Sequence, residues 1–346
     1  MSGNTKNIVT VKEIAKRAGV SVSTVSRVLS GVDTMIPISE KTRRRVLQVC
    51  EEMQFLPDVN HGRLQTRRSH TIALLVRRYS TTIPDQFIFD EAIGRFLSTL
   101  ETDLGRAGYV ITIQGVDDEY EDSREYLKIL RNNTADGLVV WGAFRGSDAY
   151  VRLRDEQRPS IAVAFPNDQA ANFIMPDNEQ GAYDITRHLL SVGHRKIALM
   201  NAGSGEIVDT LRERGYQRAI QEAGGTPVLL RANYSVKGGM VAAEKLFANR
   251  DGVTAVFAAN DLMAIGTMQV AQRHGLRVPE DFAIAGFDGS SHGEITSPPI
   301  TTGRLPLEEM GTLAARHIVE MIEGKNTGGC QITLPVEVLR RKSTGG

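Results

Sequence analysis

The chain has 346 residues, of which 41% are hydrophobic and 24% are charged, as in ordinary globular proteins of two or three domains. Its two cysteines, Cys50 and Cys330, exclude a disulfide framework and a cysteine-rich metal site, and we expect neither metal nor cofactor. The sequence shows no N-terminal signal peptide and no run of about 18 apolar residues that could span a bilayer. We therefore expect a cytoplasmic protein with no membrane partner.

Charge is distributed unevenly along the chain. Residues 1–70 contain twelve Lys or Arg and six Asp or Glu, so this segment carries a net charge of +6. Because the whole chain has 41 residues of each sign, residues 71–346 carry −6. A basic segment in front of an acidic remainder predicts a polyanionic partner for the N-terminal segment alone.

The stretch from Thr10 to Arg27 predicts two short helices joined by a glycine turn. Thr10 and Glu13 form a capping box, Gly19 ends the first helix, and Ser21 caps the second. The start of the second helix then presents five side chains, Val22, Ser23, Thr24, Ser26 and Arg27. This pattern is typical of a helix-turn-helix whose second helix enters the DNA major groove, although a helical hairpin beside a larger core has the same spacing.

A third helix is predicted after a loop at residues 30–38. Ser39 would cap this helix and Pro57 would stop it. Its predicted buried face consists of Val46, Leu47, Cys50 and Met53. Three helices with one apolar stripe each can close a small core. Residues 58–70 are polar and basic, and we expect a linker that becomes helical when it is held against DNA.

From Thr71 onward, short apolar runs alternate with amphipathic helices. Strands are predicted at 72–76, 110–113, 137–141, 160–165, 196–200, 227–230, 255–259 and 282–287. The helices between them include 91–107, 178–191, 208–223 and 261–274. Apolar strands that alternate with helices predict parallel sheets covered on both faces, in a mixed α/β protein. The number of units favours two doubly wound lobes, with a ligand cleft at the carboxyl ends of the strands.

Several longer motifs occur in a fixed order along the chain. They are VTVKEIAKRAGVSVSTVSRVLSG at 9–31, ISEKTRRRVLQVCEEMQFLPD at 38–58, DNEQGAYDITRHLLSVGHRKIALM at 177–200, RERGYQRAI at 212–220, ANDLMAIG at 259–266, IAGFDGSS at 284–291, SPPITTGRLPLEEMG at 297–311 and LPVEVLRRKST at 334–344. In this order they resemble the motifs of the LacI/GalR family of bacterial transcription regulators, over nearly the whole chain.

The resemblance implies a helix-turn-helix head followed by a hinge and a body of two lobes similar to periplasmic binding proteins. The implied boundaries are 1–57 for the head, 58–70 for the hinge and 71–346 for the body, with an N-lobe at about 71–173 and 303–331 and a C-lobe at about 174–302 and 332–346. The implied function is that of a repressor whose affinity for operator DNA is changed by a small sugar or sugar derivative bound between the lobes. The operator would be near-palindromic and double-stranded, and the protein a homodimer, since the chain has no leucine-heptad tail.

The resemblance assigns DNA contacts in the head. Val22 and Ser23 occupy the positions that family members vary, where Val22 offers a contact to a thymine methyl group. Arg27 is suited to guanine, and Thr24 and Ser26 match positions that contact bases or phosphates. The remaining assigned contacts are Thr10 and Ser21, which also cap helices, and either Ser30 or Thr34 in a loop about three residues longer than in relatives.

The predicted hinge departs from the family pattern. Leu64 matches the apolar side chain that is inserted into the central base step and kinks the duplex. Before it, Asn60, His61 and Gly62 replace the small residues usual in the family, and Gly62 weakens a helix by about 1 kcal/mol relative to alanine. His61 is bulky for a narrow minor groove.

The resemblance also implies effector-binding residues in the body. Arg212 matches the family's effector-binding arginine, whose guanidinium can bind hydroxyls, a carboxylate or a phosphate. Asp288 and Asn260 directly follow predicted strands, and their alternatives are a turn residue and a helix cap without a ligand. Tyr79 and Phe87, in the loop after the first strand, could stack on a sugar face.

Trp141, the only tryptophan, ends a predicted strand and is either a stacking platform for a sugar or a residue that lines the cleft.

Two other functions fit a doubly wound fold. A nucleotide-linked enzyme such as an oxidoreductase is opposed by the lack of a G-x-G-x-x-G fingerprint, a P-loop and a nucleophile elbow. A plain solute-binding protein is opposed by the basic head and by the lack of a signal peptide.

Overall fold

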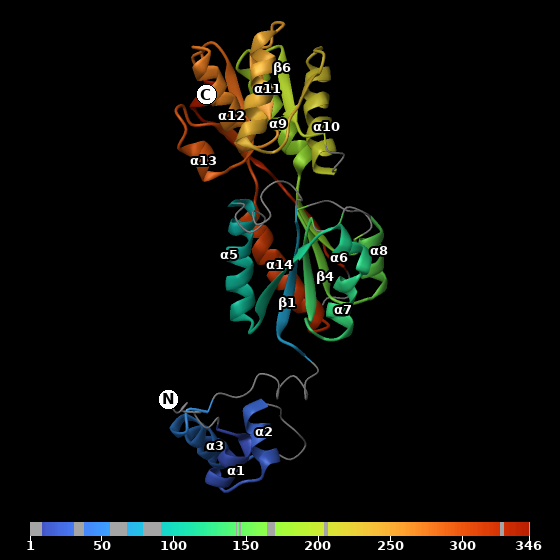
Figure 1. Cartoon of the computed structure of the whole chain (residues 1–346), viewed down its shortest axis with the longest axis vertical. Helices are drawn as coiled ribbons and strands as arrows, with labels where there is room; N and C mark the ends of the chain where they lie inside the picture. Colours follow the sequence, from blue (N-terminus) through green and yellow to red (C-terminus); the bar gives the residue numbers. More distant parts are fainter. Residues whose placement is uncertain are drawn as a thin grey trace, which may run out of the picture. The chain divides into compact units, whose positions relative to one another are not determined.

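The computed structural model describes the chain in nine segments (Figure 1): residues 9–30, 38–55, 68–78, 91–142, 144, 147–164, 170–203, 207–325 and 329–345. Its contacts divide the chain into two units, Met1–Thr71 with Arg131–Asp136, and Ile72–Leu130 with Gly137–Gly346. The first unit contains the head and the second contains both lobes of the body.

The head consists of three helices, α1 (Val11–Ala18), α2 (Val22–Ser30) and α3 (Glu40–Glu52). The predicted capping box is confirmed, because the Thr10 N–H donates to Glu13 Oε2 at 2.7 Å and the Glu13 N–H donates to Thr10 Oγ1 at 3.4 Å. The Thr10 N–H and the Thr10 hydroxyl both donate to the Glu13 carboxylate, and these two hydrogen bonds lower the pKa of Glu13. Gly19 ends α1 with φ of +62°, a left-handed conformation that glycine adopts without strain.

The head core is one cluster of small and branched apolar side chains. Its buried members are Ile14, Ala15, Ala18, Val25, Val28, Val46, Val49 and Cys50. The prediction of a buried Leu47 is wrong, because this side chain is 48% exposed and Val49 takes a place on the inner face. Successive residues of a helix differ by about 100° in direction, so Leu47 points away from the stripe formed by Val46, Val49 and Cys50.

The N-lobe is built on a six-stranded sheet in the order β11-β5-β4-β3-β1-β2. The strands are β1 (Thr71–Arg77), β2 (Val110–Val116), β3 (Gly137–Trp141), β4 (Ser160–Val163), β5 (Phe173–Pro176) and β11 (Gln331–Leu334). The helices are α5 (Glu91–Arg106), α6 (Asp118–Ser123), α7 (Glu125–Arg131), α8 (Ser147–Asp155) and α14 (Leu307–Ile322), of which α5 and α14 pack together (Figure 1). The strand registers from β1 through β3, β4 and β5 to β11 are all parallel.

The C-lobe has a second six-stranded sheet, in the order β12-β10-β9-β8-β6-β7. The strands are β6 (Ile197–Asn201), β7 (Val228–Arg231), β8 (Ala255–Ala258), β9 (Ala283–Asp288), β10 (Thr301–Arg304) and β12 (Glu337–Leu339). The helices are α9 (Asn178–Ser191), α10 (Ile207–Glu222), α11 (Val236–Ala248), α12 (Asp261–Arg273) and the short α13 (Ser291–Glu294), with a 3₁₀ turn at Lys342–Thr344. Only β12, at the edge, pairs antiparallel among the registered strands. Two doubly wound sheets confirm the predicted fold class.

The main chain passes between the two sheets three times. The passages follow β5 at Pro176, β10 at Arg304 and β11 at Leu334. The predicted boundaries after 173, 302 and 331 lie two or three residues earlier, because β5 and β11 stay paired up to Pro176 and Leu334. Similarly, β10 stays paired with β9 up to Arg304.

Helices α9 and α10 approach each other closely beside the second sheet. A Cβ atom on Gly215 would lie 2.0 Å from the carbonyl oxygen of Glu179, so only glycine fits at this crossing. The close approach places Arg212 of α10 next to Asn178 at the start of α9.

Candidate functional sites

The start of α2 forms a small polar network on the surface of the head. Ser21 Oγ accepts the Thr24 N–H at 3.1 Å and lies 2.8 Å from both Ser23 Oγ and Thr24 Oγ1. Val22 is 42% exposed beside this network, and Ser23 is exposed. An apolar group and a hydroxyl are therefore available at the leading end of the helix, where a recognition helix contacts base edges.

The other predicted DNA contacts of the head are less exposed or lie outside the described residues. Thr24, Ser26 and Arg27 are half-buried, and Thr10 is exposed at the start of α1. The side chain of Ser30, and residues His61 and Leu64 of the hinge, lie outside the described residues. The structure thus brings together the α2 side chains, and the hinge contacts stay predictions.

Arg212 is buried at the carboxyl edge of the C-lobe sheet, with 6% of its surface exposed. Its Nε donates to Asn178 Oδ1 at 2.9 Å, and its Nη1 donates to the carbonyl oxygen of Ala259, which follows β8. The guanidinium also lies over the ring of Phe287, 4.0 Å from its centroid. These contacts fix the orientation of the guanidinium before any ligand arrives.

Asp288, the last residue of β9, lies beside this arginine. Its Oδ1 is 4.0 Å from Arg212 Nη2, and about a quarter of its side chain is exposed. Its φ of +119° lies in a region that non-glycine residues rarely adopt, so the surrounding structure holds this residue under backbone strain. The predicted pair Arg212 and Asp288 is therefore brought together at the expected edge of the sheet.

Asn260 serves as the N-cap of α12, which was the alternative considered for it. Its Oδ1 accepts the Met263 N–H at 2.9 Å, and the residue is 8% exposed. Next to it, the carboxylate of Asp261 accepts the Ser290 N–H and the Thr302 hydroxyl, both at 2.7 Å. Burial raises the pKa of Asp261, although these hydrogen bonds oppose the shift.

Sequence reasoning missed three further polar residues near Arg212. The Tyr234 hydroxyl donates to the Asp209 carboxylate, and Asn201 Nδ2 donates to the carbonyl oxygen of Asp209 at 3.0 Å. Burial raises the pKa of Tyr234 far above its ordinary value, so this hydroxyl keeps its proton. Asn201 could have been found from its place at the end of an apolar strand, whereas Asp209 and Tyr234 carry no comparable signal.

Of the three aromatic residues predicted at the effector site, the structure describes Trp141. Trp141 ends β3 but is 8% exposed, and its ring packs 4.9 Å from the ring of Phe96 on α5. This packing favours the alternative in which Trp141 is a core residue that lines the cleft and does not serve as a stacking platform for a sugar. Tyr79 and Phe87 lie outside the described residues.

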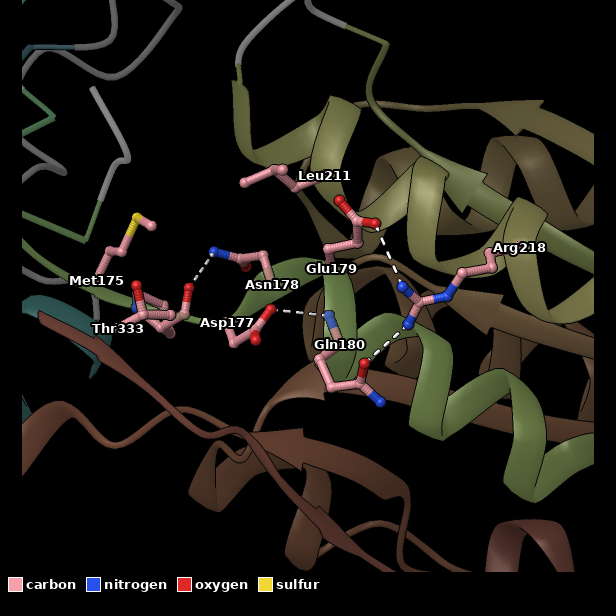
Figure 2. A pocket seen from close by; sticks show the side chains of 9 residues that line it. Met175, Asp177, Asn178, Glu179, Gln180, Leu211, Arg218 and Thr333 are labelled. Carbon is pink, nitrogen blue, oxygen red and sulfur yellow. Dashed lines mark hydrogen bonds and ion pairs between the residues drawn. The ribbon is translucent and has the colours of Figure 1, made fainter. Parts of the chain in front are cut away.

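A hollow of about 260 Å³ lies beside the first passage between the sheets (Figure 2). Met175, Leu211 and Thr333 contribute to its lining, and Figure 2 shows Glu179 and Arg218, which also line it, paired directly with each other. Arg218 lies 3.5 Å from Glu179 and donates to Gln180 at 2.8 Å, while Asp177 adds a second carboxylate to the lining. Asp288 is not among the residues that line this hollow.

Among the residues that the structure describes, no group of three or more His, Cys, Asp and Glu side chains could hold a metal ion. None of the helices described is long and apolar enough to cross a membrane.

A capped helix-turn-helix in front of a two-lobed body defines the class of ligand-responsive DNA-binding regulators. Residues 10–58 match the bacterial regulatory proteins of the lacI family, and residues 186–344 match the periplasmic binding protein-like domain. The HTH-type transcriptional regulator DegA of Bacillus subtilis (strain 168) is 30% identical over 343 residues, covering 97% of this chain and 98% of DegA. The HTH-type transcriptional repressor PurR of Vibrio vulnificus (strain CMCP6) is 31% identical, covering 91% and 92%.

Solved structures agree with this relationship. The lac repressor dimer bound to operator and the anti-inducer ONPF superposes with a TM-score of 0.85 at 23% identity, covering 97% of this chain and 99% of that chain. The complex of the transcriptional regulator CelR with cellobiose has a TM-score of 0.70 at 27% identity, with the same coverage. The chain belongs to the lacI family of bacterial regulatory proteins. It is a transcriptional regulator with a DNA-binding head and an effector-binding body, and its family sets aside the enzyme alternative.

Proposed function

We propose that this protein represses transcription as a homodimer on a near-palindromic operator, and that a small sugar or sugar derivative changes its operator affinity. The observation that supports the proposed effector binding is the Arg212–Asp288 pair at the carboxyl edge of the C-lobe sheet. A fixed guanidinium next to a partly exposed carboxylate offers a donor and an acceptor, which is the pattern that adjacent hydroxyls require. Operator DNA is found in the bacterial cytoplasm, where we place the protein.

In the proposed complex with DNA, the leading end of α2 lies in the major groove. Val22 contacts a thymine methyl group, Ser23 a base edge, and Arg27 a guanine. The hydroxyls of Thr10, Ser21, Thr24, Ser26 and Ser30 contact phosphates or bases, while His61 and Leu64 act in the minor groove. The exposure of Val22 and Ser23 supports this arrangement.

In the proposed complex with the effector, Asp288 accepts hydrogen bonds from the ligand. Because Arg212 already uses Nε and Nη1, its Nη2 is the group that reaches the ligand. Asn260 contributes its amide nitrogen, since its oxygen caps α12. Tyr79 and Phe87 stack on the sugar, and Trp141 supports the wall of the cleft. The cellobiose complex of CelR supports a sugar as the ligand class.

Exposed apolar side chains support the proposed homodimer. Val110 and Ile113 on the edge strand β2 are 60% and 40% exposed, and Ile295 after α13 is 82% exposed. The carboxylate of Glu91 on α5 contacts Ser291 on α13 at 2.8 Å, so the two lobes adjoin on this side. A second copy that covers these residues would remove their apolar surface from water.

The operator half is tested by binding of the full chain to the DNA upstream of its own gene at two salt concentrations. Arg27→Ala should weaken specific binding by roughly tenfold or more, because a bidentate contact to guanine contributes ~1–3 kcal/mol. The control Arg106→Ala removes an arginine that is exposed on α5. An absence of salt-dependent binding by a chain with a folded head would contradict the proposal.

The effector half is tested by a thermal-shift screen of monosaccharides, disaccharides, sugar acids and purines. A ligand of the cleft raises the unfolding temperature by mass action, and Asp288→Ala should abolish this rise while operator binding persists. Asp251→Ala, at an exposed carboxylate paired with Lys196, serves as the control. A purine that stabilises the protein where no sugar does would overturn the proposed ligand class.

A further inference from the structure

Helix α5 carries an arginine that joins two helices of the N-lobe. Arg95 forms a forked ion pair with Glu308 in the first turn of α14, with Nε and Nη2 at 2.8 and 3.0 Å from the two carboxylate oxygens. The side chain of Arg95 is 18% exposed and that of Glu308 is 43% exposed, so the arginine is the more shielded partner.

The same guanidinium also reaches the C-lobe. Arg95 Nη1 lies 3.4 Å from the carbonyl oxygen of Asp288 and 3.3 Å from that of Gly289. Its Nη2 lies 3.3 Å from the carbonyl oxygen of Leu305, where the chain returns to the N-lobe. One side chain thus contacts both the turn after β9 and the second passage between the lobes.

One helical turn before Arg95, Glu91 contacts the same region. Its two carboxylate oxygens accept the Ser291 N–H at 2.8 Å and the Ser291 hydroxyl at 3.0 Å, and His292 Nδ1 lies 3.0 Å from Oε2. Burial raises the pKa of Glu91, but the hydrogen bonds from Ser291 and His292 outweigh burial and lower the pKa overall. Glu91 and Arg95 lie on one face of α5 and are therefore bonded to consecutive peptide groups between residues 288 and 291.

The C-lobe holds the other side of this turn. Asp261 accepts the Ser290 N–H at 2.7 Å, and Thr302 Oγ1 accepts the Gly289 N–H at 3.1 Å. The backbone from Asp288 to Ser291 is thus bonded alternately to one lobe and to the other. Asp288 itself has the strained φ of +119°, which needs such external support.

We propose that Glu91 and Arg95 are positioning residues that set the orientation of Asp288 for the effector and couple its occupancy to α5. An effector that draws the backbone of Asp288 toward its hydroxyls displaces the two carbonyl oxygens to which Arg95 donates. Because α5 packs against β2, which carries Val110 and Ile113, the displacement reaches the surface assigned to the dimer. This inference rests on the proposed function, in which Asp288 binds the effector.

Glu91 and Arg95 together form a clamp on the turn at residues 288–291. This clamp is tested by hydrogen–deuterium exchange of the full chain, without sugar or DNA, on a peptide that covers residues 287–292. In Arg95→Met and Glu91→Ala, the amides of Gly289, Ser290 and Ser291 should exchange roughly five- to tenfold faster, the loss expected for one hydrogen bond. Arg106→Met, at an exposed arginine of the same helix, is the matched control and should exchange as the parent. Exchange at the parent rate in both clamp variants overturns the proposal.

A second variant separates the clamp from the ion pair. Glu308→Gln removes the charge next to Arg95 but leaves the guanidinium able to donate to the carbonyl oxygens of Asp288 and Gly289. Exchange of the turn should then stay within about twofold of the parent, which is less than the loss of one hydrogen bond. If Glu308→Gln accelerates exchange as much as Arg95→Met does, the ion pair alone accounts for the effect and the clamp is refuted.

Coupling is tested by operator affinity without any effector. Arg95→Met should change the dissociation constant for the upstream DNA at least threefold, while Arg106→Met should not, because only Arg95 contacts the turn. Faster exchange with unchanged operator affinity overturns the coupling. If neither parent nor variant binds this DNA, the proposed function fails, and the exchange result still decides whether the clamp exists.

Discussion

The two functional regions hold their polar side chains in opposite ways. On the head, the Ser21 hydroxyl is bonded to Ser23 and Thr24 in the first turn of α2, which lie within three residues of it. In the body, Arg212 is bonded to Asn178 and to Ala259, which are 34 and 47 positions away. The DNA-facing surface is thus a local feature of one helix, whereas the effector site also connects separate elements of the C-lobe.

The two kinds of bonding predict where a substitution is tolerated. A side chain that bonds only within its own helix can be replaced without disturbing the packing of other elements. A buried side chain that satisfies groups on several elements contributes to stability as well as to binding. Operator preference can therefore vary with little effect on folding, but effector preference cannot vary freely at Arg212.

The largest expected effect is at Arg212. Arg212→Met should lower the free energy of unfolding of the body by about 3 kcal/mol, because it leaves the buried oxygens of Asn178 and Ala259 without their donor. Urea unfolding followed by the fluorescence of Trp141 measures this loss. Arg214→Met, at a largely exposed arginine of the same helix, should change stability by less than about 0.5 kcal/mol. Equal losses in the two variants would contradict a special role of Arg212 in the stability of the body.

A smaller loss is expected where α9 and α10 meet. Gly215→Ala should cost ~1–3 kcal/mol, because the new methyl group overlaps the Glu179 carbonyl oxygen. Gly105→Ala provides the matched control, since a Cβ there meets only the Glu101 side chain at 4.0 Å. That control should be neutral or stabilise α5 by up to about 1 kcal/mol. Both are measured by the same urea unfolding experiment, and a destabilised control would refute the steric explanation.

Loss of the capping box should lower the stability of the head alone. Thr10→Ala should destabilise the head by about 1 kcal/mol, because it removes an acceptor for an N-terminal amide of α1. Hydrogen exchange of α1 amides should accelerate, while exchange in the body stays unchanged. Thr102→Ala, on the exposed surface of α5, is expected to leave the head amides unaffected. A response of the body to Thr10→Ala would show that the two regions are not separable.

The smallest change in stability is expected at Ser23. Ser23→Ala should alter the free energy of unfolding by less than about 0.5 kcal/mol, because this hydroxyl is exposed and is bonded to its near neighbour Ser21. The preference of the Ser23→Ala variant among operator sequences should nevertheless shift by about 1 kcal/mol at one base pair. Selection from a randomised operator library measures the shift, and an unchanged preference would remove Ser23 from the contact surface.

The sequence predicted those elements that have long apolar runs or strong caps. The predicted helices at 91–107, 178–191, 208–223 and 261–274 lie within one residue of α5, α9, α10 and α12. Four strands were missed, namely β5, β10, β11 and β12, because they have three or four residues each and all but β5 lack a continuous apolar run. Strands so short are defined by their neighbours in the sheet rather than by their own side chains.

The site shows the same limit. Arg212 and Asp288 were predicted from their motifs, and the fold brings them within 4.0 Å. The supports of the pair were not predicted, since Asn178 and Arg95 are far from Asp288 in the sequence and follow no local pattern. Long-range partners depend on how the elements pack, which periodicity and capping do not specify.

The three passages between the lobes have a consequence for synthesis on the ribosome. The N-lobe sheet lacks β11 until residue 334 has been made, which is about 160 residues after β5. At roughly 5–20 residues per second, this delay amounts to ~10–30 s, during which β5 presents an open edge. The helices of the head are complete by Glu52, so the nascent chain acquires its DNA-binding module well before the module that regulates it. Quality control during translation therefore falls mainly on the N-lobe, the half that is begun first and stays incomplete for the longer time.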